Sequence, residues 1–372
     1  MKTVYFDNAA TTPLHPLVLE EMIASASVFG NPSSLHAAGR KAKAIRELVR
    51  RQIAEIFHVT RAEVLFTSGA TEANNIAIAS ALRQPRINRV ITSKLEHASV
   101  LAPCQYFATL YDKELVYLPH DLEGKLDLAF LEAELAKGPA FIALMHGNNE
   151  LGNINPIAEI GRLSKQSDSI FHCDVVQTVL WTEIDAINEG IDSLSCSAHK
   201  FYGPKGVGVL VANKRQKLQG LYHGGGQEKG FKPGTENIMG IAGLGKAFEL
   251  LVQDRTERTT RIASLREYTI EQLTQCIDGL KFNGSITSSL PSILNFQLPC
   301  SKELSMVLLE LDLNGVQVSG GSACSSGSSK GSHVIEAIGK ERIGPSIRVS
   351  FNQENTKEEV NFLVQQLQAI QS

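Results

Sequence analysis

The sequence predicts an α/β fold in which a mostly parallel sheet is covered by helices. From about residue 60 to 215, short apolar runs alternate with helical stretches, a pattern typical of parallel strands joined by helices. The chain has 372 residues, more than one ordinary hydrophobic core accommodates, which indicates two domains or one large α/β unit. Hydrophobic residues at 43% and charged residues at 20% are typical of globular proteins.

The elements are expected in this order. An amphipathic helix precedes the sheet, because apolar side chains recur at helical spacing at Ala42, Ile45, Val49, Ile53 and Ile56. Strands are predicted over the apolar runs 63–67, 89–92, 141–145, 169–173, 193–196 and 206–211. Active sites of such sheets lie at the carboxyl ends of the strands. The polar residues that follow each run are therefore the candidates for function.

Helices are expected again after the sheet. A long one begins near Gly243, with Leu244, Phe248 and Leu251 on one face, and continues to Leu273 as a bridge between domains. At the C-terminal end, Thr356 and Glu359 have the spacing of a capping box. They precede the apolar residues Val360, Leu363, Val364, Leu367 and Ile370.

Charge and composition exclude several classes of protein. A formal net charge of −3 gives no general attraction to nucleic acid or to a membrane surface. No uncharged apolar run is long enough to span a bilayer. The polar residues Asp7 and Asn8 come directly after the first six residues, so no apolar signal segment is expected. The six cysteines form no CxxC pair, so no structural zinc site is expected. Cys173 and Cys196 lie in apolar runs, and we expect them to be buried and inert.

Residues 319–333, SGGSACSSGSSKGSH, carry Cys324 in a stretch where eleven of fifteen residues are Gly or Ser. By composition alone, such a stretch is a linker with an incidental thiol. A thiol on a flexible tether could also react at one site and deliver the group that it has bound at a second site. The second interpretation requires a reactive site elsewhere in the chain.

A first part of such a site is the turn TSGATEANN at residues 67–75, which follows a predicted strand and opens a helix. Small residues there leave backbone N–H groups free to bind a phosphate at the helix N-terminus, and Thr71 adds a hydroxyl. The motif GxxxxGK[ST] is absent, which disfavours a nucleoside triphosphate. An ordinary helix cap explains the turn equally well.

A buried acid and a lysine complete the pattern. The run SIFHCD ends on Asp174, with Gln177 one turn later, and SAHK brings Ser197, His199 and Lys200 to the end of the next strand. A buried carboxylate needs a cation or several donors. Pyridoxal phosphate would use all of these groups. Lys200 would form the Schiff base, Asp174 would keep the ring nitrogen protonated, and the turn at 69–71 would hold the phosphate. Taken alone, a single lysine such as Lys200 is more often a solvated surface residue, and the flanking Ser197 and His199 favour the site.

Two further polar residues follow predicted strands. His97, in SKLEHASV, could lie on the ring face and exchange protons with the substrate, or could be a helix-cap or surface histidine. Asn149, in HGNNELG, could donate a hydrogen bond to the phenolic oxygen of the ring.

These motifs together resemble those of cysteine desulfurases of the NifS/IscS type. The resemblance rests, in order along nearly the whole chain, on DNAATTP (7–13), GNPSSLH (30–36), TSGATEANN, EHASVL, HGNNELG, HCDVVQ, SAHKFYGPKGVG, GTEN (234–237), GSACSSG and IRVS. It implies the fold-type I pyridoxal-phosphate transferase fold of the class V aminotransferase group, working as a homodimer. In this fold a large domain, 16–245, contains the mostly parallel sheet between helices. Residues 1–15 and 246–372 form a smaller α+β domain that carries the mobile cysteine loop 319–333.

The resemblance also assigns roles. It makes Lys200 the Schiff-base lysine, Asp174 the partner of the pyridine nitrogen, His97 the stacking acid/base and Cys324 the cysteine that receives sulfur. Arg348 would clamp the substrate carboxylate with the help of Asn31, and Thr235 would reach the phosphate of the neighbouring subunit. The remaining cofactor contacts would come from Ala70, Thr71, Ser197 and His199 at the phosphate, and from Asn149 and Gln177 near the phenolic oxygen.

The sequence departs from the family pattern twice. Lys232 and Pro233 stand where an arginine is common two residues before Gly-Thr, and Asn352 and Gln353 stand where a basic residue is expected after IRVS. A lysine offers a point charge without the fork of an arginine. The departures leave the lysine, aspartate, histidine and cysteine unchanged.

The sequence therefore predicts a cytoplasmic pyridoxal-phosphate enzyme that removes sulfur from L-cysteine, releases L-alanine and leaves a persulfide on Cys324. The sulfur would pass to an acceptor protein, in iron–sulfur cluster assembly or in tRNA or DNA thiolation. No metal, no membrane and no direct nucleic-acid contact are expected. The alternatives are a selenocysteine lyase, another class V aminotransferase, or a non-catalytic scaffold or sulfur carrier on the same fold.

Overall fold

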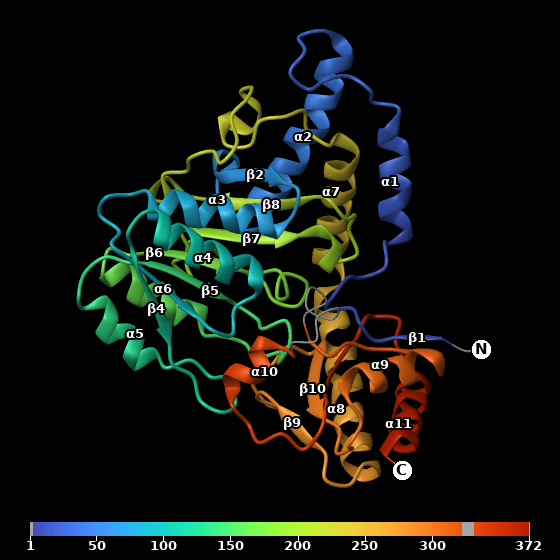
Figure 1. Ribbon diagram of the computed structural model, residues 1–372. Coiled ribbons are helices and arrows are strands. Elements are labelled where there is room, and N and C mark those ends of the chain that lie inside the picture. Colours follow the sequence, from blue (N-terminus) through green and yellow to red (C-terminus); the bar gives the residue numbers. More distant parts are fainter. Residues whose placement is uncertain (1–2, 322–330, 372) are drawn as a thin grey trace.

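The computed structural model describes residues 3–321 and 331–371, and a seven-stranded sheet forms the upper part of this described region (Figure 1). In spatial order its strands are β2 (Val64–Thr67), β8 (Gly208–Ala212), β7 (Ser193–Ser197), β6 (Ile170–Asp174), β5 (Phe141–Met145), β3 (Arg89–Ser93) and β4 (Glu114–Leu118). Only β8 runs antiparallel to its neighbours, β2 and β7. The predicted α/β fold with a mostly parallel sheet is confirmed.

The predicted strands correspond to observed strands to within two residues at each end. The strand β4 was not predicted, because it lies at the sheet edge and its sequence, ELVYL, contains an exposed acidic residue and three half-buried positions. Edge strands bury less apolar surface and so have a weaker hydrophobic pattern.

Helices cover both faces of this sheet, and the side chains of each strand alternate between them. Phe141 and Ala143 pack with α3 (Ala70–Leu82) and α4 (Ala98–Leu110), whereas Ile142 and Leu144 pack on the opposite side with α6 (Ile157–Gln166). The other helices on that second face are α2 (Ala37–Ile56), α5 (Leu128–Leu135) and α7 (Ile238–Gln253). The predicted amphipathic helix lies within α2.

The predicted long helix is two helices, which corrects the sequence-based expectation. The first, α7, begins at Ile238 and is capped by the side chain of Asn237, and α8 (Arg255–Cys276) follows it. Asp254 separates them with φ −117° and ψ 15°, outside the helical region. Aromatic packing anchors α7, because Phe248 contacts Phe57 and Phe201 with ring centroids 5.9 and 4.8 Å apart.

The lower part of Figure 1 holds a second group of elements. The strands β9 (Lys281–Asn283), β10 (Ile293–Gln297) and β12 (Ser346–Ser350) form an antiparallel sheet, and β1 (Val4–Tyr5) pairs in parallel with β11 (Val316–Gln317). The helices of this group, with α8, are α9 (Leu304–Leu313), α10 (His333–Ile338) and α11 (Lys357–Gln371), whereas α1 (Pro16–Ala26) lies in the upper part of the figure against α7. The predicted capping box is present at α11, where Thr356 and Glu359 bond reciprocally.

Short 3₁₀ turns complete the described chain: η1 (Arg61–Glu63), η2 (Ala198–Lys200), η3 (Lys214–Gln216) and η4 (Gln227–Gly230). Within the described residues, no helix combines the length and the apolar character needed to cross a membrane. The division into domains 16–245 and 1–15 with 246–372 stays a prediction, and its second boundary falls inside α7.

Candidate active site

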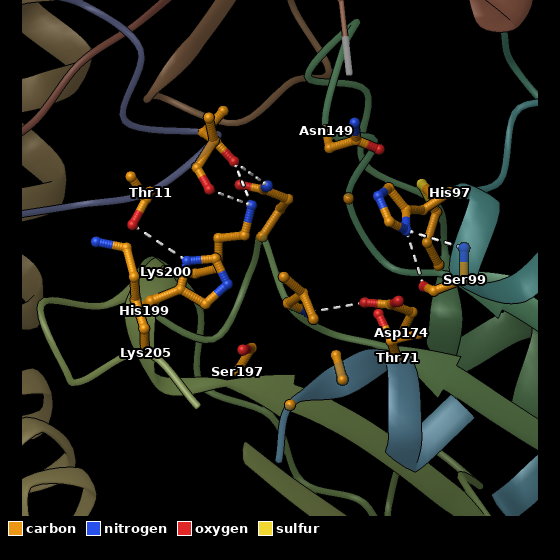
Figure 2. Close-up of a pocket in the computed structure, with 18 of the residues that line it drawn as sticks. Thr11, Thr71, His97, Ser99, Asn149, Asp174, Ser197, His199, Lys200 and Lys205 are labelled. Carbon is orange, nitrogen blue, oxygen red and sulfur yellow. Dashed lines mark hydrogen bonds between the residues drawn. The ribbon is translucent and has the colours of Figure 1, made fainter. Parts of the chain in front are cut away.

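A cavity of about 520 Å³ opens at the carboxyl ends of the sheet strands and brings together ten of the predicted site residues. They are Ala70, Thr71, His97, Asn149, Asp174, Gln177, Ser197, His199, Lys200 and Arg348. Figure 2 shows His97 and Asp174 on one side of this cavity and His199 and Lys200 on the other. The position agrees with the general rule for parallel α/β sheets.

Three predicted residues are not part of this group. Asn31 and Thr235 are exposed and do not line the cavity within this chain. Thr235 was expected to act on a neighbouring subunit, so its role stays a prediction, as does that of Asn31. Cys324 and most of the predicted loop 319–333 lie outside the described residues.

The turn before α3 forms one end of the cavity. Gly69 is the N-cap residue and has no side chain to accept from the first N–H groups of the helix, which therefore remain available to a ligand. The turn lies tightly against β8, because a Cβ atom at Gly208 would be 2.7 Å from the Cα atom of Gly69. The structure thus presents a helix N-terminus to the cavity, with Ser197 beside it.

Asp174 ends β6 and is buried, as predicted. Its carboxylate accepts hydrogen bonds from the backbone N–H of Val176 and from Nδ2 of Asn74, both at 3.0 Å. Sequence reasoning missed Asn74, which is completely buried on α3. Its position two residues before the helical run IAIASAL was the available signal, since a buried amide needs partners.

His97 is both a helix cap and a cavity residue. Its Nδ1 atom lies 3.1 Å from the backbone N of Ser99 and 2.8 Å from Oγ of Ser99, at the start of α4. Burial lowers the pKa of His97 below its ordinary value, Asp174 opposes this effect, and Lys200 adds to it. The two sequence interpretations of His97, cap and site residue, are therefore compatible.

Lys200 is not a solvated surface lysine. It is half-buried at the end of η2, and its Nζ atom donates to the carbonyl oxygens of Ala9 and Ala10 at 2.5 and 2.9 Å. The neighbouring His199 contacts Thr11, and burial with the nearby Lys200 and Lys205 lowers its pKa to about 4. The N-terminal segment thus lies directly over the amine.

Two amides lie on the same cavity. Nε2 of Gln177 donates to the carbonyl oxygen of Ala9 at 3.0 Å. Asn149 is buried, and its Oδ1 atom has no hydrogen-bond partner among the described residues. A buried polar atom of this kind is costly unless a ligand or water satisfies it.

Arg348 has only 1% of its surface exposed. It donates from Nη1 to the carbonyl oxygen of Asn149 at 2.9 Å and from Nη2 to Oδ1 of Asp7 at 2.6 Å, while its buried Nε atom has no partner among the described residues. Asp7 is a second residue that sequence reasoning missed. Its partner lies 341 positions away, so no local pattern could indicate the contact.

Another missed residue, Glu96, lies directly before His97 and is only 1% exposed. Its Oε1 atom accepts from the backbone N–H of Met145 at 2.8 Å, and burial raises the pKa of this carboxyl well above its ordinary value. Burial therefore favours the protonated, neutral form of this side chain. It joins the ends of β3 and β5 beside the cavity.

The departures from the family pattern lie outside the cavity lining. Asn352 accepts hydrogen bonds from the backbone of Glu354 and Asn355, and Gln353 accepts one from Arg258. Asn352 therefore serves local structure after β12, and Gln353 connects this segment to α8. Within the described part of the chain, no cluster of three or more His, Cys, Asp or Glu side chains could hold a metal ion.

Cys173 and Cys196 are completely buried, as predicted, and burial raises the pKa of both thiols. A thiol reacts as its thiolate. These two cysteines are therefore inert.

Comparison with known proteins gives a consistent result. The family model for aminotransferase class-V matches residues 4–363. The chain is 43% identical to the cysteine desulfurase IscS of Dictyoglomus turgidum, over 99% of this chain and 94% of that protein. A solved structure of a NifS-like protein has a TM-score of 0.90 and 33% identity, over 99% of both chains. A structure described as SspA in complex with cysteine has a TM-score of 0.81 and 31% identity, over 95% of this chain and 100% of that one. On its sequence and its fold, this chain belongs to the aminotransferase class-V family and, within it, to the cysteine desulfurases.

Proposed function

We propose that the protein is a pyridoxal-phosphate-dependent enzyme that takes sulfur from L-cysteine, releases L-alanine and carries the sulfur as a persulfide on Cys324. The observation that carries this proposal is the meeting of Lys200, Asp174 and the open N-terminus of α3 at one cavity. A structural relative described as bound to cysteine supports the substrate. A cysteine desulfurase is favoured over a selenocysteine lyase or a general transaminase by the names of the relatives.

The residues present fit the cofactor. When bound, pyridoxal phosphate withdraws electrons from the substrate Cα atom through its ring. The first N–H groups of α3, with Thr71, Ser197 and His199 nearby, would hold its phosphate. Asp174 would accept from the ring nitrogen, and Asn149 would donate from Nδ2 to the phenolic oxygen, with Gln177 beside it.

The roles of this chain's residues follow from their chemistry. The fork of Arg348, whose Nε atom has no partner among the described residues, would bind the substrate carboxylate. Lys200 would hold the cofactor and, as a free amine, would remove the Cα proton of the substrate. His97 would hold or return a proton near the reacting atoms.

Sulfur transfer would follow at Cys324. The thiolate of Cys324 attacks the substrate sulfur, an S–S bond forms and the C–S bond breaks. The electron pair of the C–S bond stays on the substrate carbon, and protonation of that carbon gives L-alanine. An ordinary thiol is only a few per cent ionised at pH 7, so removal of its proton by the substrate would assist.

The protein would act as a cytoplasmic homodimer in which Thr235 reaches the phosphate of the partner's site and Asn31 assists substrate binding. An acceptor protein, in iron–sulfur cluster assembly or in thiolation of tRNA or DNA, would take the persulfide sulfur. Neither a membrane nor nucleic acid is proposed as a direct partner.

One experiment tests the proposal. L-cysteine is added to the purified protein, and L-alanine, sulfide and visible absorbance are measured together. We expect equal amounts of L-alanine and transferred sulfur. Cys324→Ala should keep the cofactor absorbance and lose persulfide, and Lys200→Ala should lower turnover at least about a hundredfold.

Other outcomes separate the alternatives. Unchanged sulfide release in Cys324→Ala would contradict the role of Cys324. A keto acid in place of L-alanine would indicate a transaminase, and preferential turnover of selenocysteine would indicate a lyase. A protein without visible absorbance and without an effect of Lys200→Ala would be a non-catalytic carrier.

A further inference from the structure

A continuous chain of hydrogen bonds, buried except at His97, connects His97 to Asp174 through two residues to which no function has been assigned. His97 Nδ1 lies 2.8 Å from Ser99 Oγ, and Ser99 Oγ accepts from Asn74 Nδ2 at 3.0 Å. The same amide nitrogen of Asn74 donates to Asp174 Oδ2, also at 3.0 Å. Figure 2 shows Ser99 and Asp174 on the same side of the cavity as His97.

The orientation of the Asn74 amide is fixed from both ends. A carboxylate can only accept, so the nitrogen of Asn74 must face Asp174. Its oxygen then accepts from His172 Nε2 at 2.9 Å and from Ser195 Oγ at 2.5 Å. Asn74, His172 and Ser195 have no exposed surface, so water cannot replace these bonds. A reversed amide would place its oxygen against the carboxylate of Asp174, where neither group can donate, so the contact with Asp174 fixes the direction of the amide.

These directions determine where the proton of His97 lies. Both N–H groups of Asn74 are used as donors, so Ser99 Oγ accepts from Asn74 and keeps its own proton to donate to His97 Nδ1. The backbone N–H of Ser99 also points at Nδ1, at 3.1 Å, as in an ordinary N-cap bond. Two donors at one ring nitrogen require a lone pair there. The proton of the neutral ring is therefore on Nε2.

We propose that Ser99 is a positioning residue that holds neutral His97 in the Nε2–H form and links it, through Asn74, to the carboxylate of Asp174. Figure 2 shows the second ring nitrogen of His97 on the edge away from Ser99, on the side of Asn149. His97 would thus present an N–H donor, and not a lone pair, to a bound substrate. This use of the donor rests on the proposed function, whereas the position of the proton does not.

Charged and titratable groups surround His97 on several elements. Asp174 on β6 favours the protonated ring, while Lys200 on η2, His333 on α10 and Arg348 on β12 disfavour it. Glu96 precedes His97, and its backbone oxygen lies 2.9 Å from Nε2 of His333. Burial is the largest influence and lowers the pKa of His97. The hydroxyl of Ser99 acts in the same direction, since it bonds to the neutral form.

The test is nitrogen NMR of the full protein labelled with ¹⁵N-histidine, measured first without cofactor or substrate. His97 is assigned by comparison with His97→Gln. We expect Nδ1 to resonate as an unprotonated nitrogen and Nε2 as a protonated one. In Ser99→Ala the two signals should move toward each other, and the pKa of His97 should rise by about half a unit to one unit, because one hydrogen bond to the neutral ring is lost.

Two matched variants separate positioning from a general effect on the fold. Ser99→Thr retains the hydroxyl and should restore the wild-type signals. Ser164→Ala removes another completely buried hydroxyl, on α6, which has no hydrogen-bond partner among the described residues and should change neither signal.

The same variants are then measured with cofactor and L-cysteine, where the acidic limb of the pH profile of kcat should move with the pKa of His97. A proton found on Nδ1, or a Ser99→Ala variant with unchanged tautomer and pKa, would overturn the proposal. A correct tautomer in a protein that does not turn over L-cysteine would contradict the proposed function and leave the positioning role supported.

Discussion

Arg348 is the largest side chain that the described fold buries completely. A buried guanidinium is costly unless its donors are used. Asp7 and the carbonyl oxygen of Asn149 use two of its nitrogens, and Nε has no partner among the described residues. The arrangement leaves a partly satisfied cation on the cavity wall. This arrangement is expected of a residue that binds a substrate carboxylate.

We therefore predict that Arg348→Lys raises KM for L-cysteine by about tenfold to a hundredfold, with a smaller change in kcat. A lysine retains the charge but cannot form two directed bonds, and a hydrogen bond to a charged group contributes about 1.5–3 kcal/mol. Steady-state formation of L-alanine over a range of L-cysteine concentrations measures both constants.

The control is Arg258→Lys. Arg258 is also buried, and it donates to the carbonyl oxygens of Leu250 and Leu251, away from the cavity. Its variant should lower stability without changing KM. An unchanged KM in Arg348→Lys would mean that another group binds the carboxylate.

At the scale of elements, the position of the phosphate turn depends on β8. Gly208, the first residue of this strand, lies between Thr67 of β2 and Ser197 of β7 in the sheet. A Cβ atom there would lie 2.6 Å from the carbonyl oxygen of Cys196 and 2.7 Å from Cα of Gly69. Both distances are below van der Waals contact, so the absence of a side chain lets the N-terminus of α3 approach the sheet.

Gly208→Ala should consequently displace the turn before α3. We expect a stability loss of about 1–3 kcal/mol from overpacking. The Kd for pyridoxal phosphate should rise at least about tenfold, because loss of one hydrogen bond from the helix N-terminus to the charged phosphate weakens binding by about that factor. Urea unfolding and titration of the visible absorbance measure the two effects.

Gly226→Ala is the matched control, because Gly226 has φ −83° and no atom lies within 4 Å of the position that a Cβ atom would take there. It should leave the Kd unchanged. An equal Kd for pyridoxal phosphate in wild type and Gly208→Ala would show that phosphate binding does not depend on the close approach of the turn to β8.

The helices and strands also show which features could be predicted from the sequence and which could not. The strand at 141–145 was predicted with its observed bounds, because five consecutive apolar residues, all buried, give a strong local signal. The break at Asp254 was missed because charged residues continue the helical composition on both sides of it. Asn74 was missed because its partners, Asp174 and His172, are about a hundred positions away.

At the scale of the whole molecule, the cavity is assembled from distant parts of the chain. The segment after β1 bonds to β12, where Ala9 N donates to Ser350 Oγ at 2.8 Å, and to η2, where Thr12 N donates to the carbonyl oxygen of His199 at 2.9 Å. Lys200 and Arg348 both contact this N-terminal segment. Sequence motifs identified most residues of the cavity. Their proximity could not be predicted, because only the folded chain brings residues 7–12, the strand ends and β12 together.

The buried polar groups that this assembly requires also predict how stability depends on pH. Burial lowers the pKa of His172 to about 3 and that of His146 to about 4. Both values lie below the ordinary value of about 6.5 in the unfolded chain. The unfolded state therefore binds protons first as the pH falls. The stabilising contribution of each neutral histidine is complete above pH 6.5 and is lost progressively between pH 6.5 and the folded-state value.

We predict that each of these histidines lowers the free energy of unfolding by about 2 kcal/mol between pH 7 and pH 5, which follows from 1.36 kcal/mol per unit of pKa difference. Urea unfolding at fixed protein concentration measures the effect. His172→Gln should be less stable than wild type at pH 7, because the bond to Asn74 is altered, yet should lose about 2 kcal/mol less over this interval. His223→Gln, which changes an exposed histidine, should lose as much as wild type. The same loss in His172→Gln as in wild type would mean that His172 is already protonated in the folded protein, with its second nitrogen donating to Ser193.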